Sequence, residues 1–208
     1  MSFFENTKKP EGLGGKIMVA MMNSGHGKLA DWGMSFLSLS TDAAVLDCGC
    51  GGGANLRKLL KRCPNGTVTG IDYSSVSVEK SKRLNAKAIS EGRCCVLEAS
   101  VAALPFEDNK FDVVTAFETV YFWPGLADCF REVYRVMKNG GTFLICNEAT
   151  GDTNKNDKWT QIISDMTIYR DVQLKTALEE AGFTDIQIHK NAHQDWLCVT
   201  GQKQEKHG

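Results

Sequence analysis

A glycine-rich stretch behind an acidic residue is the part of this sequence whose residue types and spacing most directly suggest chemistry. Residues 45–55 read VLDCGCGGGAN, which places two cysteines and four glycines after Asp47. The stretch could hold a metal or a redox centre on Cys48 and Cys50, bind a nucleotide, or form a turn with a purely structural role. A zinc site is disfavoured because the chain has no C-x-x-C pair and its four histidines are scattered. We therefore expect no bound metal.

The residues around the glycines favour a ligand-binding loop. An apolar, strand-like run precedes them, and a helical pattern, ANLRKLLKRC, follows them. Glycine amides in such a position can approach a ligand closely beside the N-terminus of a helix. Gly49, Gly51 and Ala54 also fit the G-x-G-x-x-A pattern of dinucleotide-binding loops, which is a weak signal by itself. Asp47 argues against a pyrophosphate, since its carboxylate would repel an anion and suit a cation.

A second acidic residue, Asp72, ends the next strand-like run, TVTGID. A carboxylate at this position can accept hydrogen bonds from both hydroxyls of a ribose. Taken alone, Asp72 could equally cap a helix or carry a charge at a strand end. Together with the glycine loop, it predicts a ligand that contains an adenosine-like sugar.

The chain alternates short apolar runs with helical patterns, which predicts a parallel sheet with helices on both faces. The strands are expected at 43–49, 67–72, 93–100, 111–118, 141–149, 184–190 and 195–203. The helices are expected at 54–63, 74–91, 124–138 and 170–181. Only a few residues separate the last two strands, too few for a crossover helix. One of these two strands must therefore run antiparallel to the sheet.

The helix expected at 124–138 has a signal at each end. Pro124 is a favourable residue for the first turn of a helix. The NGG at 139–141 can adopt the left-handed conformation of a helix C-cap.

Composition limits the classes of partner. The 208 residues suffice for one domain, and 24 Lys and Arg against 25 Asp and Glu give a net charge of −1. This balance provides no electrostatic reason to expect nucleic acid or an anionic membrane. The stretch MSFFENTKKPEGLGG lacks the apolar core of a signal peptide, and IMVAMM is far too short to cross a bilayer. We expect a cytoplasmic protein whose eight cysteines are free thiols.

Four stretches, in order, resemble one known family. VLDCGCGGG, GIDYSS, LPFEDNKFDVVTAFE and REVYRVMKNGGTFLI are similar to successive motifs of class I S-adenosylmethionine-dependent methyltransferases, over roughly residues 41–200. The resemblance implies a Rossmann-like α/β fold: a seven-stranded, mostly parallel sheet with an antiparallel C-terminal strand and helices on both faces. We expect residues 41–203 to form this methyltransferase domain, with residues 1–40 as an N-terminal helical cap segment of the same domain.

The resemblance also implies a binding site for S-adenosyl-L-methionine and its product S-adenosyl-L-homocysteine. Asp47 and the loop backbone would hold the methionine end, Asp72 would bind the ribose hydroxyls, and Tyr73 would lie against the adenine. Many relatives have Asp where this chain has Ser100, so a hydroxyl or backbone group would replace that contact with the adenine. The implied cofactor residues are Asp47, Gly49, Gly51, Gly53, Asp72, Tyr73, Ser100, Val101 and Glu118.

Three segments are candidates for the acceptor side. Segment 118–124 is unusually aromatic and lies beyond the fourth strand, at the carboxyl edge where open α/β sheets bind ligands. Segments 18–28 and 157–169 are expected to cap the pocket. The expected pocket residues are Asn23, His26, Tyr121, Phe122, Trp123 and Trp159, and the catalytic candidates are Glu118, Tyr121 and His26. For Trp123, packing under the following helix is the alternative.

Methyl transfer from a sulfonium requires a nucleophile that is held in line with the methyl carbon and shielded from water. The sequence therefore predicts S-adenosylmethionine-dependent methyl transfer to a small-molecule acceptor, by a monomer or a homodimer. Two alternatives stay open: an NAD(P)-dependent oxidoreductase, and a protein that binds S-adenosylmethionine without turnover.

Overall fold

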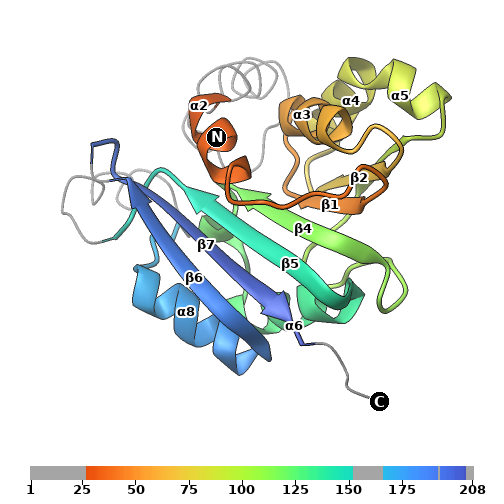
Figure 1. The fold of residues 1–208 in the computed structure, drawn as a ribbon. Coiled ribbons are helices and arrows are strands. Elements are labelled where there is room, and N and C mark those ends of the chain that lie inside the picture. The colour runs from red at the N-terminus through yellow and green to blue at the C-terminus, as the bar shows by residue number, and fades with distance from the viewer. Residues whose placement is uncertain (1–26, 152–165, 192, 205–208) are drawn as a thin grey trace.

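The fold has a single twisted sheet at its centre (Figure 1). The computed structural model describes residues 27–151, 166–191 and 193–204. Within them the strand order is β3-β2-β1-β4-β5-β7-β6. The strands are β1 (Ala44–Cys48), β2 (Thr67–Asp72), β3 (Cys94–Glu98), β4 (Phe111–Phe117), β5 (Met137–Asn147), β6 (Phe183–Asn191) and β7 (Trp196–Lys203).

The direction of the strands follows from the lengths of their connections. β1 to β5 pair in parallel, with helices in every connection except the one from β3 to β4, whereas β7 pairs antiparallel with both β5 and β6. The short turn between β6 and β7 permits only a hairpin. The predicted seven-stranded sheet with an antiparallel C-terminal strand is confirmed.

Helices cover both faces of the sheet (Figure 1). α6 and α8 pack on one face, and α2, α3 and α4 pack on the other. The helices are α2 (Gly27–Met34), α3 (Ala54–Arg62), α4 (Ser75–Leu84), α5 (Ala86–Ser90), the 3₁₀ helix η2 (Val120–Phe122), α6 (Leu126–Val136) and α8 (Asp171–Glu180). The division into segments 1–40 and 41–203 stays a prediction.

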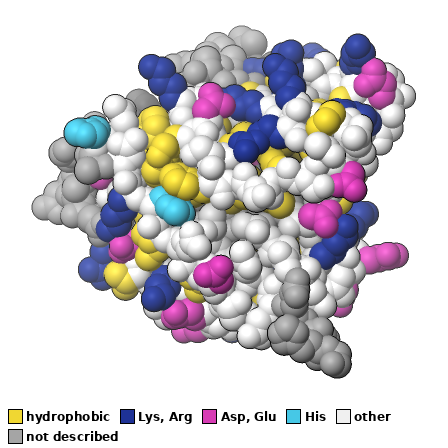
Figure 2. Space-filling model, in the orientation of Figure 1, with side chains coloured by type: hydrophobic (Ala, Val, Ile, Leu, Met, Phe, Trp, Pro, Cys, Tyr) yellow, Lys and Arg dark blue, Asp and Glu magenta, His cyan; other side chains and the backbone are white. Residues whose placement is uncertain are grey.

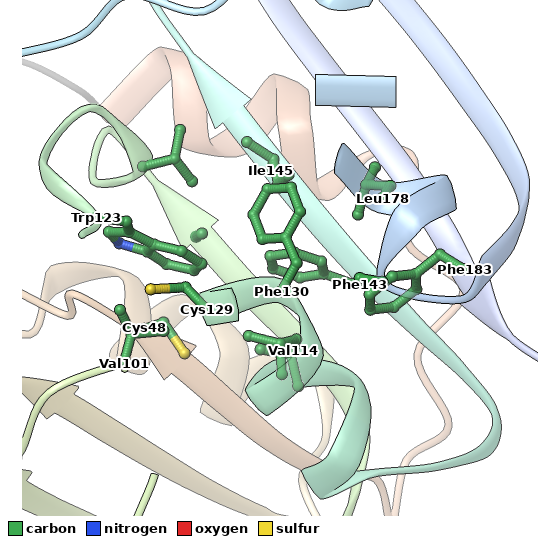
Figure 3. Packing of buried hydrophobic residues seen from close by; sticks show 14 of the residues in the cluster. Cys48, Val101, Val114, Trp123, Cys129, Phe130, Phe143, Ile145, Leu178 and Phe183 are labelled. Atoms are coloured by element: carbon green, nitrogen blue, oxygen red, sulfur yellow. The ribbon is translucent and has the colours of Figure 1, made fainter. Parts of the chain in front are cut away.

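Aromatic rings form much of the apolar cluster between the sheet and α6 and α8 (Figure 3). The rings of Phe130 and Phe143 are 5.4 Å apart and meet edge to face. Phe183 of β6 extends this row at 5.6 Å from Phe143. Large buried rings of this kind hold α6 firmly on β5.

The expected ends of the helix at 124–138 were both wrong. α6 begins at Leu126, after Gly125 in a left-handed conformation, so that Pro124 precedes the helix. At the other end, α6 stops at Val136, and the NGG lies inside β5. Met137 already pairs with Phe111 of β4 and pairing resumes at Thr142, so the NGG lies in an irregular stretch of the strand and does not cap a helix.

The helix expected at 74–91 is broken at Asn85 into α4 and α5. The buried side chain of Asn85 donates from Nδ2 to the carbonyl oxygens of Gly53 and Ser81, at 3.1 and 2.9 Å. This amide therefore ties the end of α4 to the glycine loop. A helical periodicity in the sequence contains no sign of such a tertiary contact.

Two of the quoted motifs contact each other through Arg135 of α6. Its guanidinium donates to the carbonyl oxygens of Leu104 and Phe106, and it pairs with Glu132. The Glu132 carboxylate in turn accepts the Leu104 N–H at 2.9 Å. The LPFED loop is thus held to α6 by charged hydrogen bonds, which are stronger than neutral ones.

Basic and acidic side chains both occur across the face drawn in Figure 2. No helix among the described residues is long and apolar enough to cross a membrane.

Candidate active site

Asp47 of β1 has an enclosed carboxylate with one oxygen unpaired. Its Oδ1 accepts a hydrogen bond from Thr115 Oγ1 of β4 at 2.7 Å, while its Oδ2 has no partner among the described residues. Burial, reinforced by the charge of Asp72, outweighs the Thr115 bond and raises the pKa of Asp47 to about 7. A buried, unpartnered carboxylate oxygen is unfavourable by itself and suits a cationic ligand group.

The loop after β1 combines packed glycines with an exposed backbone. Gly49, Gly51 and Gly53 have φ angles of +77°, +51° and +81°, a region that favours glycine. A Cβ at position 49 would lie 2.5 Å from Thr119 Oγ1, whereas a Cβ at position 51 would meet nothing within 4 Å. Gly51 thus borders open space, and its backbone is accessible to a ligand.

Asp72 lies at the end of β2, directly beside this loop. Its Oδ2 accepts the Gly51 N–H and its Oδ1 accepts the Ser74 N–H, both at 2.9 Å. Burial raises the pKa of Asp72. The two bonds orient the carboxylate and leave each oxygen with further acceptor capacity. Next to it, Tyr73 is 39% exposed, which is unusual for a large ring.

Ser100 and Val101 follow β3, the neighbour of β2. The exposed hydroxyl of Ser100 accepts the Ala102 N–H at 3.2 Å, which stabilises a tight turn. Val101 is buried at the margin of the cluster that contains Trp123. Neither arrangement decides what replaces the missing carboxylate, so the adenine contact at Ser100 stays a prediction.

Glu118 and Tyr121 connect the end of β4 to the end of β5. Glu118 Oε1 accepts hydrogen bonds from the Tyr121 hydroxyl, at 3.1 Å, and from the Glu148 N–H. The Tyr121 oxygen accepts the Ala149 N–H at 3.1 Å. Burial, together with the nearby Glu148, raises the pKa of Glu118 to about 8. Glu118 also has a φ of +60°, an uncommon conformation for a residue other than glycine.

Trp123 lies in the apolar cluster on the face of α6 (Figure 3). Its ring stacks on Phe143 at 6.3 Å and meets Phe130 edge to face at 5.8 Å. Its Nε1–H donates to Thr119 Oγ1 at 2.6 Å. These contacts are those expected of the packing alternative, and a role for Trp123 in the acceptor pocket stays a prediction. Phe122 meets Tyr121 edge to face at 6.2 Å.

The other pocket candidates, Asn23, His26 and Trp159, lie outside the described residues. Segments 18–28 and 157–169 are described only in part. In the described part of the second segment, Thr167 N–H donates to the carbonyl oxygen of Tyr121 at 2.9 Å. That segment therefore approaches the end of β4.

All eight cysteines carry free thiols, and all except Cys95 are buried. Burial raises the pKa of both Cys48 and Cys50. A buried thiol of this kind is a poor nucleophile. The residues described here contain no group of three or more His, Cys, Asp or Glu side chains suited to a metal.

Sequence reasoning missed the residues that support the loop from other elements. Thr115 orients Asp47, and Asn85 anchors Gly53. A threonine inside a buried strand could have been suspected as a hydrogen-bond donor. For Asn85, which ends one helix and begins the next, the sequence pattern contains no such signal.

Comparison with known proteins identifies the fold and its chemistry. Residues 46–145 match the family model described as a methyltransferase domain. This region is a class I methyltransferase domain. It contains the glycine loop, Asp72 and the end of β4, and the cofactor of its class is S-adenosylmethionine. The resemblance stated from the motifs is confirmed.

Curated relatives of the methyltransferase domain are longer proteins. Cycloartenol-C-24-methyltransferase of Arabidopsis thaliana is 32% identical over 156 residues, 71% of this chain and 46% of the relative. Cycloartenol-C-24-methyltransferase 1 of Oryza sativa is 36% identical over 109 residues, 52% of this chain and 31% of the relative. This chain therefore spans less than half of either relative.

Solved methyltransferase structures share the fold over nearly the whole chain. The methyltransferase solved with the Haloferax volcanii activator Trm112 superposes with a TM-score of 0.80 at 20% identity, covering 91% of this chain and 96% of that one. A phosphoethanolamine N-methyltransferase 2 of Haemonchus contortus, solved with S-adenosylhomocysteine, has a TM-score of 0.78 at 16% identity and covers 99% and 61%. Identities this low support the fold alone.

The residues of this methyltransferase domain fit its cofactor. The unpaired Oδ2 of Asp47 is suited to the ammonium group of the methionine end. The open space at Gly51 allows a ligand against the backbone, and Asp72 has free acceptor capacity for ribose hydroxyls. The individual contacts stay predictions.

Proposed function

We propose that this chain transfers the methyl group of S-adenosylmethionine to a small-molecule acceptor by direct displacement. The observation that carries the proposal is the unpaired Asp47 Oδ2 beside the open backbone of Gly51 and the oriented carboxylate of Asp72. The ammonium group of the cofactor would meet the Asp47 carboxylate, its methionine end would lie against the Gly51 backbone, and its ribose hydroxyls would meet the Asp72 carboxylate.

Methyl transfer from a sulfonium requires that the acceptor and the methyl group are aligned, and it needs no covalent enzyme intermediate. An electron pair of the acceptor, either a lone pair or the π pair of a C=C bond, forms a bond to the methyl carbon while the carbon–sulfur bond breaks, and the electron pair of the broken bond stays on the sulfur. The protein must align the two reactants and exclude water. Glu118 and Tyr121, at the carboxyl end of β4, are proposed to form the side of the site on which the acceptor binds. Because the pKa of Glu118 is about 8, its carboxyl group is mostly protonated at neutral pH and is a hydrogen-bond donor.

A small acceptor is supported by the relatives and by the balance of charge. Two of the matched proteins are named for methylation of cycloartenol at carbon 24, and another is squalene methyltransferase 1 of Botryococcus braunii. The chain's net charge of −1 gives no electrostatic attraction for nucleic acid. We also propose that the protein is located in the cytoplasm and is a monomer or a homodimer.

The test is a screen of sterol, isoprenoid, amine, phenol, lactam and primary amide acceptors with S-adenosylmethionine, read as S-adenosylhomocysteine formed. Turnover with any acceptor supports the proposal. Tight binding of S-adenosylhomocysteine without turnover across all classes would favour the binding-only alternative, and failure to bind it would refute the cofactor assignment.

Two glycine variants provide a matched control for the screen. Gly51 and Gly92 both have positive φ, and a Cβ at either position would meet nothing within 4 Å, but Gly92 lies in the turn before β3. Gly51→Val and Gly92→Val therefore impose similar backbone strain. Only Gly51→Val should abolish S-adenosylhomocysteine binding.

A further inference from the structure

Asn147 is a buried amide without a hydrogen-bond partner. Among the described residues, buried side-chain atoms that lack a partner occur only in Asp47, Asn85 and Asn147. The free oxygen of Asp47 is accounted for by the cofactor, and Asn85 uses its Nδ2 for two hydrogen bonds. Asn147 is 0% exposed, and both its Oδ1 and its Nδ2 are unpaired. Buried polar groups are nearly always paired, so this amide calls for an explanation.

Its place in the sheet is next to Glu118. Asn147 is the last residue of β5, and the preceding residue, Cys146, accepts the Glu118 N–H at 3.0 Å. The following residue, Glu148, donates its N–H to the Glu118 carboxylate. By strand alternation, Asn147 shares a face with Ile145, which belongs to the same apolar cluster as Trp123. The unpaired amide therefore lies where the structure joins β4 to β5.

Two unusual features occur together at the carboxyl ends of β4 and β5. One is the unpaired amide of Asn147, and the other is the left-handed backbone of Glu118, at φ +60°. Strained backbone and unpaired polar groups are retained most often where a ligand uses them. Asn147 is not among the residues expected to bind the cofactor, whereas Glu118 is one of them, so the unpaired amide needs a partner other than the cofactor.

We propose that Asn147 recognises the methyl acceptor by pairing with a neutral, planar group that has a hydrogen-bond donor beside an acceptor, such as a lactam or a primary amide. This inference rests on the proposed function. An asparagine amide presents one acceptor and one donor in a plane, so only a two-point partner satisfies both atoms. A carboxylate would satisfy Nδ2 alone. An ammonium would satisfy Oδ1 alone.

The experiment uses 2-pyridone, a lactam, as the probe and N-methyl-2-pyridone, which lacks the donor, as its matched control. Each is titrated into ¹⁵N-labelled protein saturated with S-adenosylhomocysteine, and the side-chain NH₂ signal of Asn147 is followed by NMR. The signal is assigned by its absence in Asn147→Leu, a variant of similar size. We expect 2-pyridone to shift this signal in a saturable way, and N-methyl-2-pyridone to leave it in place.

The leucine variant provides a second readout. Because it removes an unpaired polar group, it should unfold at the same temperature as the wild type or higher, and it should bind 2-pyridone about tenfold more weakly or worse, the effect of losing two neutral hydrogen bonds. An unshifted Asn147 signal, equal shifts by both probes, or unchanged affinity for 2-pyridone in the variant would overturn the proposal. If leucine prevents folding, Asn147→Ala serves the same assignment and affinity measurement. Calorimetry of S-adenosylhomocysteine on the same samples separates the outcomes, since loss of that binding refutes the proposed function and not the role of Asn147.

Discussion

The two halves of the site are built in different ways. On the side of β1 and β2, the glycine loop and Asp72 lie within 26 residues of one another, from 47 to 72, and the loop's shape comes from glycines with positive φ. On the side of β4 and β5, Glu118 and Tyr121 bond to Glu148 and Ala149, partners that are 30 and 28 residues away. The first half takes its loop shape from local backbone geometry, with support from Thr115 and Asn85, and the second depends on strand pairing.

This difference predicts how each half responds to mutation. Changes near the loop should weaken cofactor binding with a modest effect on folding. Changes at the β4–β5 edge should affect stability and its pH dependence, and those at Trp123 and Tyr121 should leave cofactor affinity nearly unchanged. Four variants test this contrast.

The largest effect is expected for Trp123→Ala. Loss of the stacked and edge-to-face contacts with Phe143 and Phe130 should lower the free energy of unfolding by about 3–5 kcal/mol. For a domain of this size, a loss of about 3 kcal/mol corresponds to a fall of roughly 6–12 °C in unfolding temperature. Calorimetry of unfolding and of S-adenosylhomocysteine binding should show reduced stability with unchanged affinity. An unchanged unfolding temperature combined with reduced turnover would instead place Trp123 in the acceptor pocket.

Asp72→Ala should produce the opposite pattern. Removing a carboxylate that accepts the Gly51 and Ser74 N–H groups and is expected to bind the ribose should weaken S-adenosylhomocysteine binding by about 1.5–3 kcal/mol, roughly 10- to 100-fold. Isothermal titration calorimetry measures this directly. Asp128 is an exposed carboxylate on α6, so Asp128→Ala is the control. Its affinity for S-adenosylhomocysteine should equal that of the wild type. Equal affinity in Asp72→Ala would remove Asp72 from the site.

Glu118→Gln tests the raised pKa at the β4–β5 edge. In the unfolded chain Glu118 ionises near its ordinary pKa of 4.5, whereas in the folded protein it keeps its proton until about pH 8. Between these values the folded state binds more protons than the unfolded state, so stability falls as pH rises. This single group contributes a slope of about 1.4 kcal/mol per pH unit. Urea unfolding from pH 5.5 to 7.5 should show a shallower decline in Glu118→Gln than in the wild type, and parallel curves would mean that Glu118 is ionised in the fold.

Tyr121→Phe should have the smallest effect of the four, a loss of about 1 kcal/mol in the free energy of unfolding. The variant removes the hydroxyl that joins Glu118 to the Ala149 N–H. Tyr134→Phe is the matched control, because its hydroxyl makes no hydrogen bond among the described residues. Equal stability of the two variants in urea would show that the Tyr121 bridge contributes nothing measurable.

The sequence predicted the sheet well because strand periodicity and connection length are short-range rules. Alternating apolar runs defined all seven strands to within a few residues, and the short last connection required a hairpin. The helix end near Pro124 was wrong because α6 begins only after Gly125, and the end at NGG was wrong because β5 begins immediately after Val136 and contains the glycines in its irregular stretch. A local cap signal does not encode where a partner strand starts the next element.

What the sequence by itself determined about this protein is its fold class, its resemblance to the methyltransferase family and the position of the glycine loop after β1. Glycine's tolerance of positive φ and the two-residue alternation of strands are properties of the local chain. Only the tertiary structure decided that Trp123 packs among phenylalanines, that Glu118 holds its proton to about pH 8, and that the Asn147 amide is buried without a partner. These properties depend on desolvation and on neighbours that sheet pairing brings together from distant parts of the chain, and no spacing along the sequence encodes them.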